Sequence, residues 1–90
     1  MSSITIINIF DGVNTSTYTH NQYYTTEDKA TVAINALATY RAQIYGGQFI
    51  GFVPDEGGFV IKNDQGEISM IYSVQTLEDA AAELIADRIV

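Results

Sequence analysis

The sequence of 90 residues contains no cysteine. A disulfide framework, a thiolate nucleophile and a zinc site with cysteine ligands are therefore excluded. No apolar run approaches the roughly 18 residues that a membrane-spanning helix needs, and residues 1–4 lack the basic segment of a signal peptide. These absences lead us to expect a cytoplasmic protein, in the host cytoplasm if its source is viral, with no membrane contact.

Basic residues are also scarce. The chain has four basic and eleven acidic residues, which gives a formal net charge of -7. The basic residues are Lys29, Arg41, Lys62 and Arg88. Binding to DNA, RNA or anionic lipid requires clustered lysine and arginine to neutralise phosphates, so we expect no direct binding to any of them. The charge leaves two readings open: an acidic face for a basic surface on another protein, or a charge that serves only solubility.

Groups for catalysis or metal binding are few. His20 is the only histidine, and one histidine cannot supply the two or three ligands of a usual histidine-based site. The acids at 55–56 and 63–67 do not follow the spacing of a calcium loop. The glycine pairs at 46–47 and 57–58 do not open a helix, as a phosphate-binding loop would. We therefore predict no enzyme, no catalytic residue, no metal site and no cofactor.

One stretch, 26–45, has the start and stop signals of an amphipathic helix. Thr25 or Thr26 can cap its first turn, Glu27 and Asp28 suit the positive end of the helix dipole, and Gly46 follows the last periodic residue. Its predicted apolar stripe consists of Ala30, Ala33, Ile34, Leu37, Tyr40 and Ile44.

The remaining segments are typical of short strands. Residues 4–10 are almost entirely apolar and β-branched, and Asp11-Gly12 predicts a type I′ hairpin turn into a weaker strand over 13–19. Three further strands are predicted at 48–53, 59–62 and 67–74. Their connections are short, so they should form an antiparallel meander. Gly51 within the first of these three indicates a bulge or a close packing contact.

A second helix is predicted to begin at Thr76-Leu77-Glu78-Asp79, a near capping box, and to run to the end of the chain. The element order is then β-β-α-β-β-β-α over a single domain, 1–90. We expect an α+β fold, a small two-layer domain with an antiparallel sheet and two helices packed on it. Whether the first hairpin joins the same sheet is open.

The order over 26–90 resembles that of double-stranded RNA-binding domains. The second helix of those domains begins with lysines that grip phosphates, whereas the corresponding position here is Thr76-Leu77-Glu78-Asp79. The resemblance therefore implies a similar order of elements and not RNA binding.

Two surfaces are candidates for binding a partner. Asp79, Glu83 and Asp87 are spaced four residues apart and form an acidic ridge on the predicted second helix, which Glu78 widens. The uncharged segment 14–26 carries tyrosines with many hydroxyl and amide groups, the chemistry of many binding loops. The tyrosines that we expect to contact a partner are Tyr18, Tyr23 and Tyr24. A solvated helix face and a core-covering connector are the structural alternatives.

These features predict a non-enzymatic protein–protein interaction module that binds a basic surface of another protein. Its most specific form is a small acidic inhibitor or nucleic-acid mimic acting on a nucleic-acid-handling complex. In size and charge the chain resembles phage-encoded anti-CRISPR and anti-restriction proteins. One alternative is an assembly module, such as a homodimer, that self-associates through its β-edges and apolar first strand. Another is a small-ligand-binding domain that uses the tyrosines.

Overall fold

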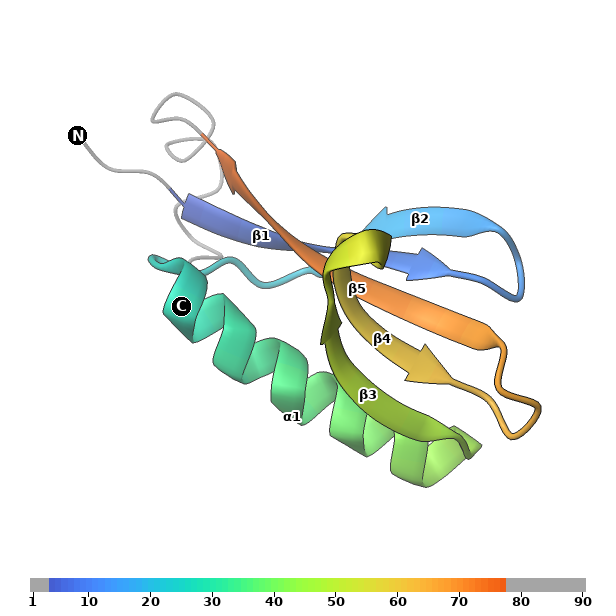
Figure 1. The fold of residues 1–90 in the computed structure, drawn as a ribbon. Helices are drawn as coiled ribbons and strands as arrows, with labels where there is room; N and C mark the ends of the chain where they lie inside the picture. Colours follow the sequence, from blue (N-terminus) through green and yellow to red (C-terminus); the bar gives the residue numbers. More distant parts are fainter. Residues whose placement is uncertain (1–3, 78–90) are drawn as a thin grey trace.

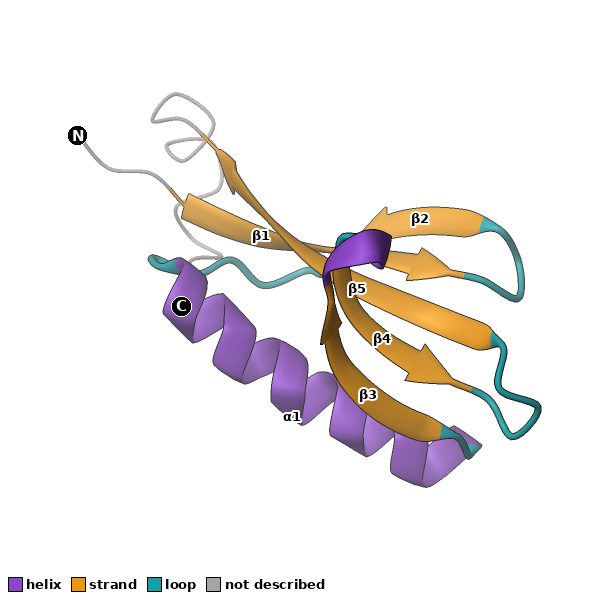
Figure 2. Cartoon of the chain, viewed as in Figure 1, coloured by secondary structure: helices purple, strands orange, loops and turns teal. Residues whose placement is uncertain are grey.

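The computed structural model describes residues 4–77, which form one five-stranded antiparallel sheet and one α-helix, α1 (Figures 1 and 2). The strands lie in the order β2-β1-β5-β4-β3. The elements are β1 (Ile4–Asp11), β2 (Ser16–Thr19), α1 (Glu27–Tyr45), β3 (Gln48–Val53), the short 3-10 helix η1 (Pro54–Glu56), β4 (Gly58–Lys62) and β5 (Ile68–Leu77). Figure 1 shows α1 running along one face of the sheet.

Helix α1 begins and ends where the sequence predicts. The Oγ1 atom of Thr26 accepts a hydrogen bond from the backbone N–H of Lys29 at 3.2 Å, so Thr26 is the N-cap. Glu27 and Asp28 occupy the first turn, where the dipole favours negative charge. At the other end, Gly46 has a φ of +81°, which stops the helix.

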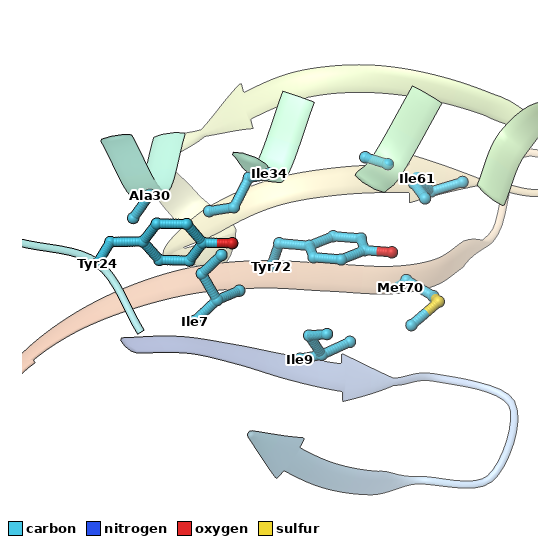
Figure 3. Packing of buried hydrophobic residues seen from close by; sticks show 9 residues of the cluster. Ile7, Ile9, Tyr24, Ala30, Ile34, Ile61, Met70 and Tyr72 are labelled. Carbon is cyan, nitrogen blue, oxygen red and sulfur yellow. The ribbon is translucent and has the colours of Figure 1, made fainter. Parts of the chain in front are cut away.

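The core lies between α1 and the sheet. Ala30, Ile34 and Ala38 are fully buried on the helix, and the small alanines let its backbone approach the strands. Figure 3 shows the rings of Tyr24 and Tyr72 within this cluster. The other buried residues of the cluster are Ile7, Ile9, Ile61 and Met70.

The predicted apolar stripe of α1 is wrong at Tyr40 and Ile44, which are exposed. The buried line advances in steps of four residues through Ala30, Ile34 and Ala38. Each residue turns the helix by about 100°, so a residue two positions past Ala38 lies on nearly the opposite side. The two large side chains at Tyr40 and Ile44 therefore point away from the buried line.

The first hairpin joins the same sheet through β1, but its turn differs from the predicted type I′ turn. Asp11 pairs with Ser16, and the turn occupies 12–15. Oδ1 of Asp11 accepts hydrogen bonds from the backbone N–H groups of Val13 and Asn14 at 2.9 and 3.3 Å, which favours this longer Asx-type turn. Strand β2 is shorter than 13–19 as a result.

Gly12 serves a close approach in this turn. A Cβ atom at Gly12 would lie 2.7 Å from the carbonyl oxygen of Ile68. The predicted type I′ turn would require a positive φ at both Asp11 and Gly12. Within the hairpin turn, a positive φ occurs instead at Thr15, with φ +54°.

The meander of β3, β4 and β5 is confirmed, as is the irregularity at Gly51, where the β3–β4 register shifts and φ is +100°. Strand β1 lies between β2 and β5. The apolar first strand is thus an inner strand, and the free edges of the sheet belong to β2 and β3.

The prediction of two helices packed on the sheet is wrong, because residues 4–77 contain a single α-helix. Thr76 and Leu77, predicted to open the second helix, are the last residues of β5 and pair with Thr5 and Ile4. The near capping box is a local signal, and the ladder that β5 makes with all eight residues of β1 overrides it. The rest of the predicted helix, 78–90, lies outside the described residues.

Candidate partner-binding site

The three tyrosines singled out from the sequence have different environments. Tyr24 is 6% exposed and Tyr23 is 9% exposed, whereas Tyr18 on β2 is 48% exposed. Thr5 and Tyr24 exchange backbone hydrogen bonds of 2.7 and 2.9 Å, so this part of the connector is extended. Its side chains alternate: Tyr24 enters the core beneath α1, and Tyr23 packs with Ile4 in a smaller cluster.

The acidic ridge, Glu78, Asp79, Glu83 and Asp87, lies outside the described residues. Within 4–77 the acidic side chains are distributed over the ends and turns of elements and form no continuous ridge of their own. These acids are Asp11, Glu27, Asp28, Asp55, Glu56, Asp64 and Glu67.

Exposed aromatic side chains gather instead where the last turns of α1 meet the β1–β2 hairpin. Tyr40 is 64% exposed, Tyr45 is 73% exposed, and Val13 in the hairpin turn is also exposed. Together with Tyr18 and Arg41 they form what we call the aromatic surface: Val13, Tyr18, Tyr40, Arg41 and Tyr45. Helix α1 carries Tyr40, Arg41 and Tyr45, strand β2 carries Tyr18, and Val13 lies in the hairpin turn.

Two cavities open on the aromatic surface, and Arg41 and Tyr45 line both of them. The larger, of about 290 Å³, lies between α1 and the β1–β2 hairpin. It is lined by Ile9, Tyr18, His20, Leu37, Tyr40, Arg41, Tyr45 and Tyr72. The smaller, of about 190 Å³, is lined by Val13, Arg41, Tyr45, Gly46, Ile61, Asn63, Ser69 and Met70.

Of the lysines and arginines in the described part of the chain, Arg41 alone lines either cavity. Its guanidinium carbon lies 4.7 Å from the centroid of the Tyr45 ring, one helical turn further along α1. This cation–π contact orients the guanidinium group against the ring. Among the described residues Arg41 forms no ion pair and no hydrogen bond through its side chain.

Asp11 is the acidic residue whose charge is felt by Arg41, but its carboxylate is already engaged. It accepts hydrogen bonds from the backbone of Val13 and Asn14, and Oδ2 accepts a third from Nδ2 of Asn14 at 2.9 Å. The backbone N–H groups of Val13 and Asn14 are the main causes that lower the pKa of Asp11, and Arg41 lowers it least. The guanidinium of Arg41 therefore keeps its donors for another acceptor.

Burial also shifts the pKa values of two other groups that line the larger cavity, His20 and Tyr72. Burial lowers the pKa of His20 below its ordinary value of 6.5, which favours the neutral imidazole. Burial also raises the pKa of the Tyr72 hydroxyl. Among residues 4–77, Arg41 is the only lysine or arginine that lines this cavity, and no aspartate or glutamate of that range lines it.

Sequence reasoning missed most of this site. It placed Tyr40 on the apolar stripe of the helix and named Arg41 as one of the basic residues. A signal was present, because Arg41 and Tyr45 are four residues apart on one helix face, and Tyr40 is out of phase with the line of buried alanines.

Two other hollows are less suited to a specific partner. One, of about 590 Å³, lies on the sheet face away from α1, and Glu56 is the one charged residue among 4–77 that lines it. The amides on that face are engaged, since Asn8 accepts from Thr19 at 3.1 Å and donates to Gln75 at 2.9 Å. The other, of about 470 Å³, is a shallow apolar strip along the first half of α1. The lining of the first is Asn8, Phe10, Thr17, Glu56, Gly57, Ile71 and Ser73.

Within the described residues 4–77, no three acidic or histidine side chains lie close enough together to hold a metal ion. The same part of the chain has no helix with the length and apolar character to cross a membrane. Comparisons with protein families, with curated proteins and with solved structures gave no match.

Proposed function

We propose that this protein is a non-enzymatic protein-binding module and that the aromatic surface is its contact region. The observation that carries the proposal is the gathering of three exposed tyrosines, Tyr18, Tyr40 and Tyr45, around the guanidinium of Arg41, which has no ion-pair partner among residues 4–77. Tyrosine and arginine are the residues most often found at the energetic centres of interfaces. A cytoplasmic location, with which the lack of cysteine is compatible, is part of this proposal.

The geometry favours binding because the cost of ordering these side chains is small. Tyrosine has only two side-chain torsions, so it loses little entropy when a partner immobilises it. Arg41 is already held over the ring of Tyr45. The cavities give a partner's side chains somewhere to insert, as hot-spot anchors do.

The test is a pull-down with the full chain as bait from a lysate of the source or host cell. The variant Tyr18→Ala/Tyr40→Ala should lose the partners that the natural chain retains, since each hot-spot side chain contributes about 2 kcal/mol or more to binding. Val32→Ala, which truncates an exposed apolar side chain elsewhere on α1, is the matched control. Equal recovery by the double variant, with an unchanged circular dichroism spectrum, would contradict the proposal.

A second candidate is the acidic inhibitor or nucleic-acid mimic, in which acidic side chains occupy a basic surface of a nucleic-acid-handling complex. It is favoured by the net charge of -7. It is also favoured by the lack of any ion pair among residues 4–77, which leaves the acidic side chains there unneutralised by contact. Screening by salt weakens exposed ion pairs, so such partners should be retained at low salt and lost at high salt.

The acidic candidate is tested by reversing Asp79, Glu83 and Asp87 to lysine. Reversing Asp55, Glu56 and Asp64 changes the net charge by the same amount at turns in the described part of the chain, and serves as the control. Loss of binding in the first variant alone supports an acidic ridge. Unchanged affinity in the first variant argues against it, and an equal loss in both variants indicates a general effect of charge.

A further inference from the structure

We infer that the partner places a carboxylate on Arg41 and a neighbouring apolar side chain in the larger cavity of the aromatic surface. The occupant is therefore a protein segment in which an acidic residue lies next to an aromatic or large aliphatic one. This inference rests on the proposed function, because it names the chemistry of the partner at the same surface.

The guanidinium of Arg41 is a set of five N–H donors in a planar fork. Among the described residues it makes no side-chain hydrogen bond and no ion pair, and the carboxylate of Asp11 is occupied by its own turn. The contact with the Tyr45 ring, 4.7 Å from the guanidinium carbon to the ring centroid, is a cation–π contact and uses no carboxylate acceptor. A carboxylate matches the fork of donors through two parallel hydrogen bonds.

A carboxylate fits the site better than a phosphoryl group does. Phosphorylated and phosphate-bearing partners are usually held by clusters of arginines. Here Arg41 is the only lysine or arginine among residues 4–77 that lines either cavity. Burial lowers the pKa of His20, which disfavours a second positive charge in the cavity. One fixed positive charge balances one negative charge, which is the charge of a carboxylate.

The larger cavity is the size of an anchor site. Its volume of about 290 Å³ lies at the lower limit of small-molecule pockets, which run from about 300 to 1,000 Å³. Ile9, Leu37 and the ring of Tyr72 line it beside the exposed rings of Tyr18 and Tyr40. Such walls favour a single apolar or aromatic side chain of the partner. Arg41, which also lines the cavity, binds the acidic residue next to that side chain.

The negative charge of the whole molecule does not oppose this contact. Exposed charges more than about 8 Å apart are largely screened at physiological ionic strength, so the guanidinium acts locally. Among the described residues that line the two cavities, Arg41 is the only lysine or arginine, so it fixes where along the aromatic surface the partner's carboxylate binds. The same arrangement is compatible with a partner that is basic overall.

The test uses the full chain and a phage-displayed library of random dodecapeptides. Enriched peptides are synthesised with their acidic residue intact or replaced by the matching amide, and their affinities are measured by fluorescence polarisation. We expect an acidic residue beside an aromatic or large aliphatic one, and a loss of about tenfold or more when the acid becomes an amide. Arg41→Gln should abolish that difference. Lys29→Gln removes the same charge near the start of the same helix and should preserve the difference.

The outcomes separate this inference from the proposed function. Peptides that bind equally well as acid and amide, or equally well to Arg41→Gln, overturn the carboxylate inference. If those peptides are still lost on Tyr40→Ala, the aromatic surface stands as the contact region. If neither substitution matters, or if no peptide is enriched, the inference and the proposed function both fall.

Discussion

The two ends of α1 carry similar residues and use them in opposite ways. Near the start of the helix, Tyr23 and Tyr24 are buried against strands. Near its end, Tyr40 and Tyr45 are exposed beside Arg41. The same side chain thus contributes to stability at one end and is available to a partner at the other. Burial, and not residue type, decides which role a tyrosine has.

The cause is the position of each tyrosine relative to the sheet. The segment before α1 is extended and bonded to Thr5, which directs Tyr24 into the core. Tyr40 and Tyr45 lie off the line of Ala30, Ile34 and Ala38 that faces the strands. If this account is right, substitutions at the two ends should differ in their effect on the free energy of unfolding.

The largest difference is expected between Tyr24→Ala and Tyr40→Ala. Truncating a large buried aromatic residue costs about 3–5 kcal/mol, whereas exposed substitutions usually change stability by less than about 0.5 kcal/mol. Urea denaturation followed by circular dichroism measures both. Comparable losses for the two variants would show that Tyr40 is part of the stabilising core and would remove the contrast between the ends.

A smaller effect tests the close approach of α1 to the sheet. Ala38 is fully buried, whereas Ala36 on the same helix is exposed. Ala38→Leu inserts atoms where there is no room and should destabilise the fold by about 1–3 kcal/mol. Ala36→Leu should change the free energy of unfolding little. A tolerated leucine at 38 would mean that the helix does not lie close to the strands at that point.

A third test concerns how much the N-cap at the start of α1 contributes to the free energy of unfolding. Thr26→Ala removes the hydroxyl that accepts from the N–H of Lys29, and such a loss typically costs about 1 kcal/mol. Thr25→Ala is the matched control, because Thr25 is exposed and precedes the cap. Chemical denaturation should separate the two variants. If Thr25→Ala were the more damaging, the helix would begin one residue earlier than described.

The regions of the fold also differ in how much of their structure could be predicted from the sequence. The bounds of α1, its cap and the meander could be predicted, because capping residues, glycines and short turns are local signals. The end of β5 could not be predicted, because its pairing with β1 is a long-range contact that overrides the helix-start pattern at Thr76. The burial of Tyr23 and Tyr24 depends on the bridge to Thr5, some twenty residues away along the chain.

The candidate site could not be predicted from the sequence for a related reason. Its members come from the first hairpin and from the end of α1, and no spacing in the sequence connects the two. Only Tyr18 was both predicted and found exposed at the site. The helical phase of Tyr40 could have been read from the alanines, but nothing local indicates that Arg41 lacks an acidic partner among residues 4–77.

The smallest effect is expected from His20, which lies in the larger cavity at the second end of the helix. Burial lowers the pKa of His20 from its ordinary value of 6.5, so the unfolded chain binds a proton more readily than the folded one. The stabilising contribution of the neutral ring is therefore complete above pH 6.5 and is lost as the pH falls through the lower pKa of the folded state. The melting temperature should therefore decrease as the pH is lowered from about 7 to about 5. His20→Gln should make this decrease smaller. An identical slope in the variant would assign the change to other groups and would remove His20 from the cavity's electrostatics. Asp11 does not interfere, because its lowered pKa places its own transition below its ordinary value of 3.8.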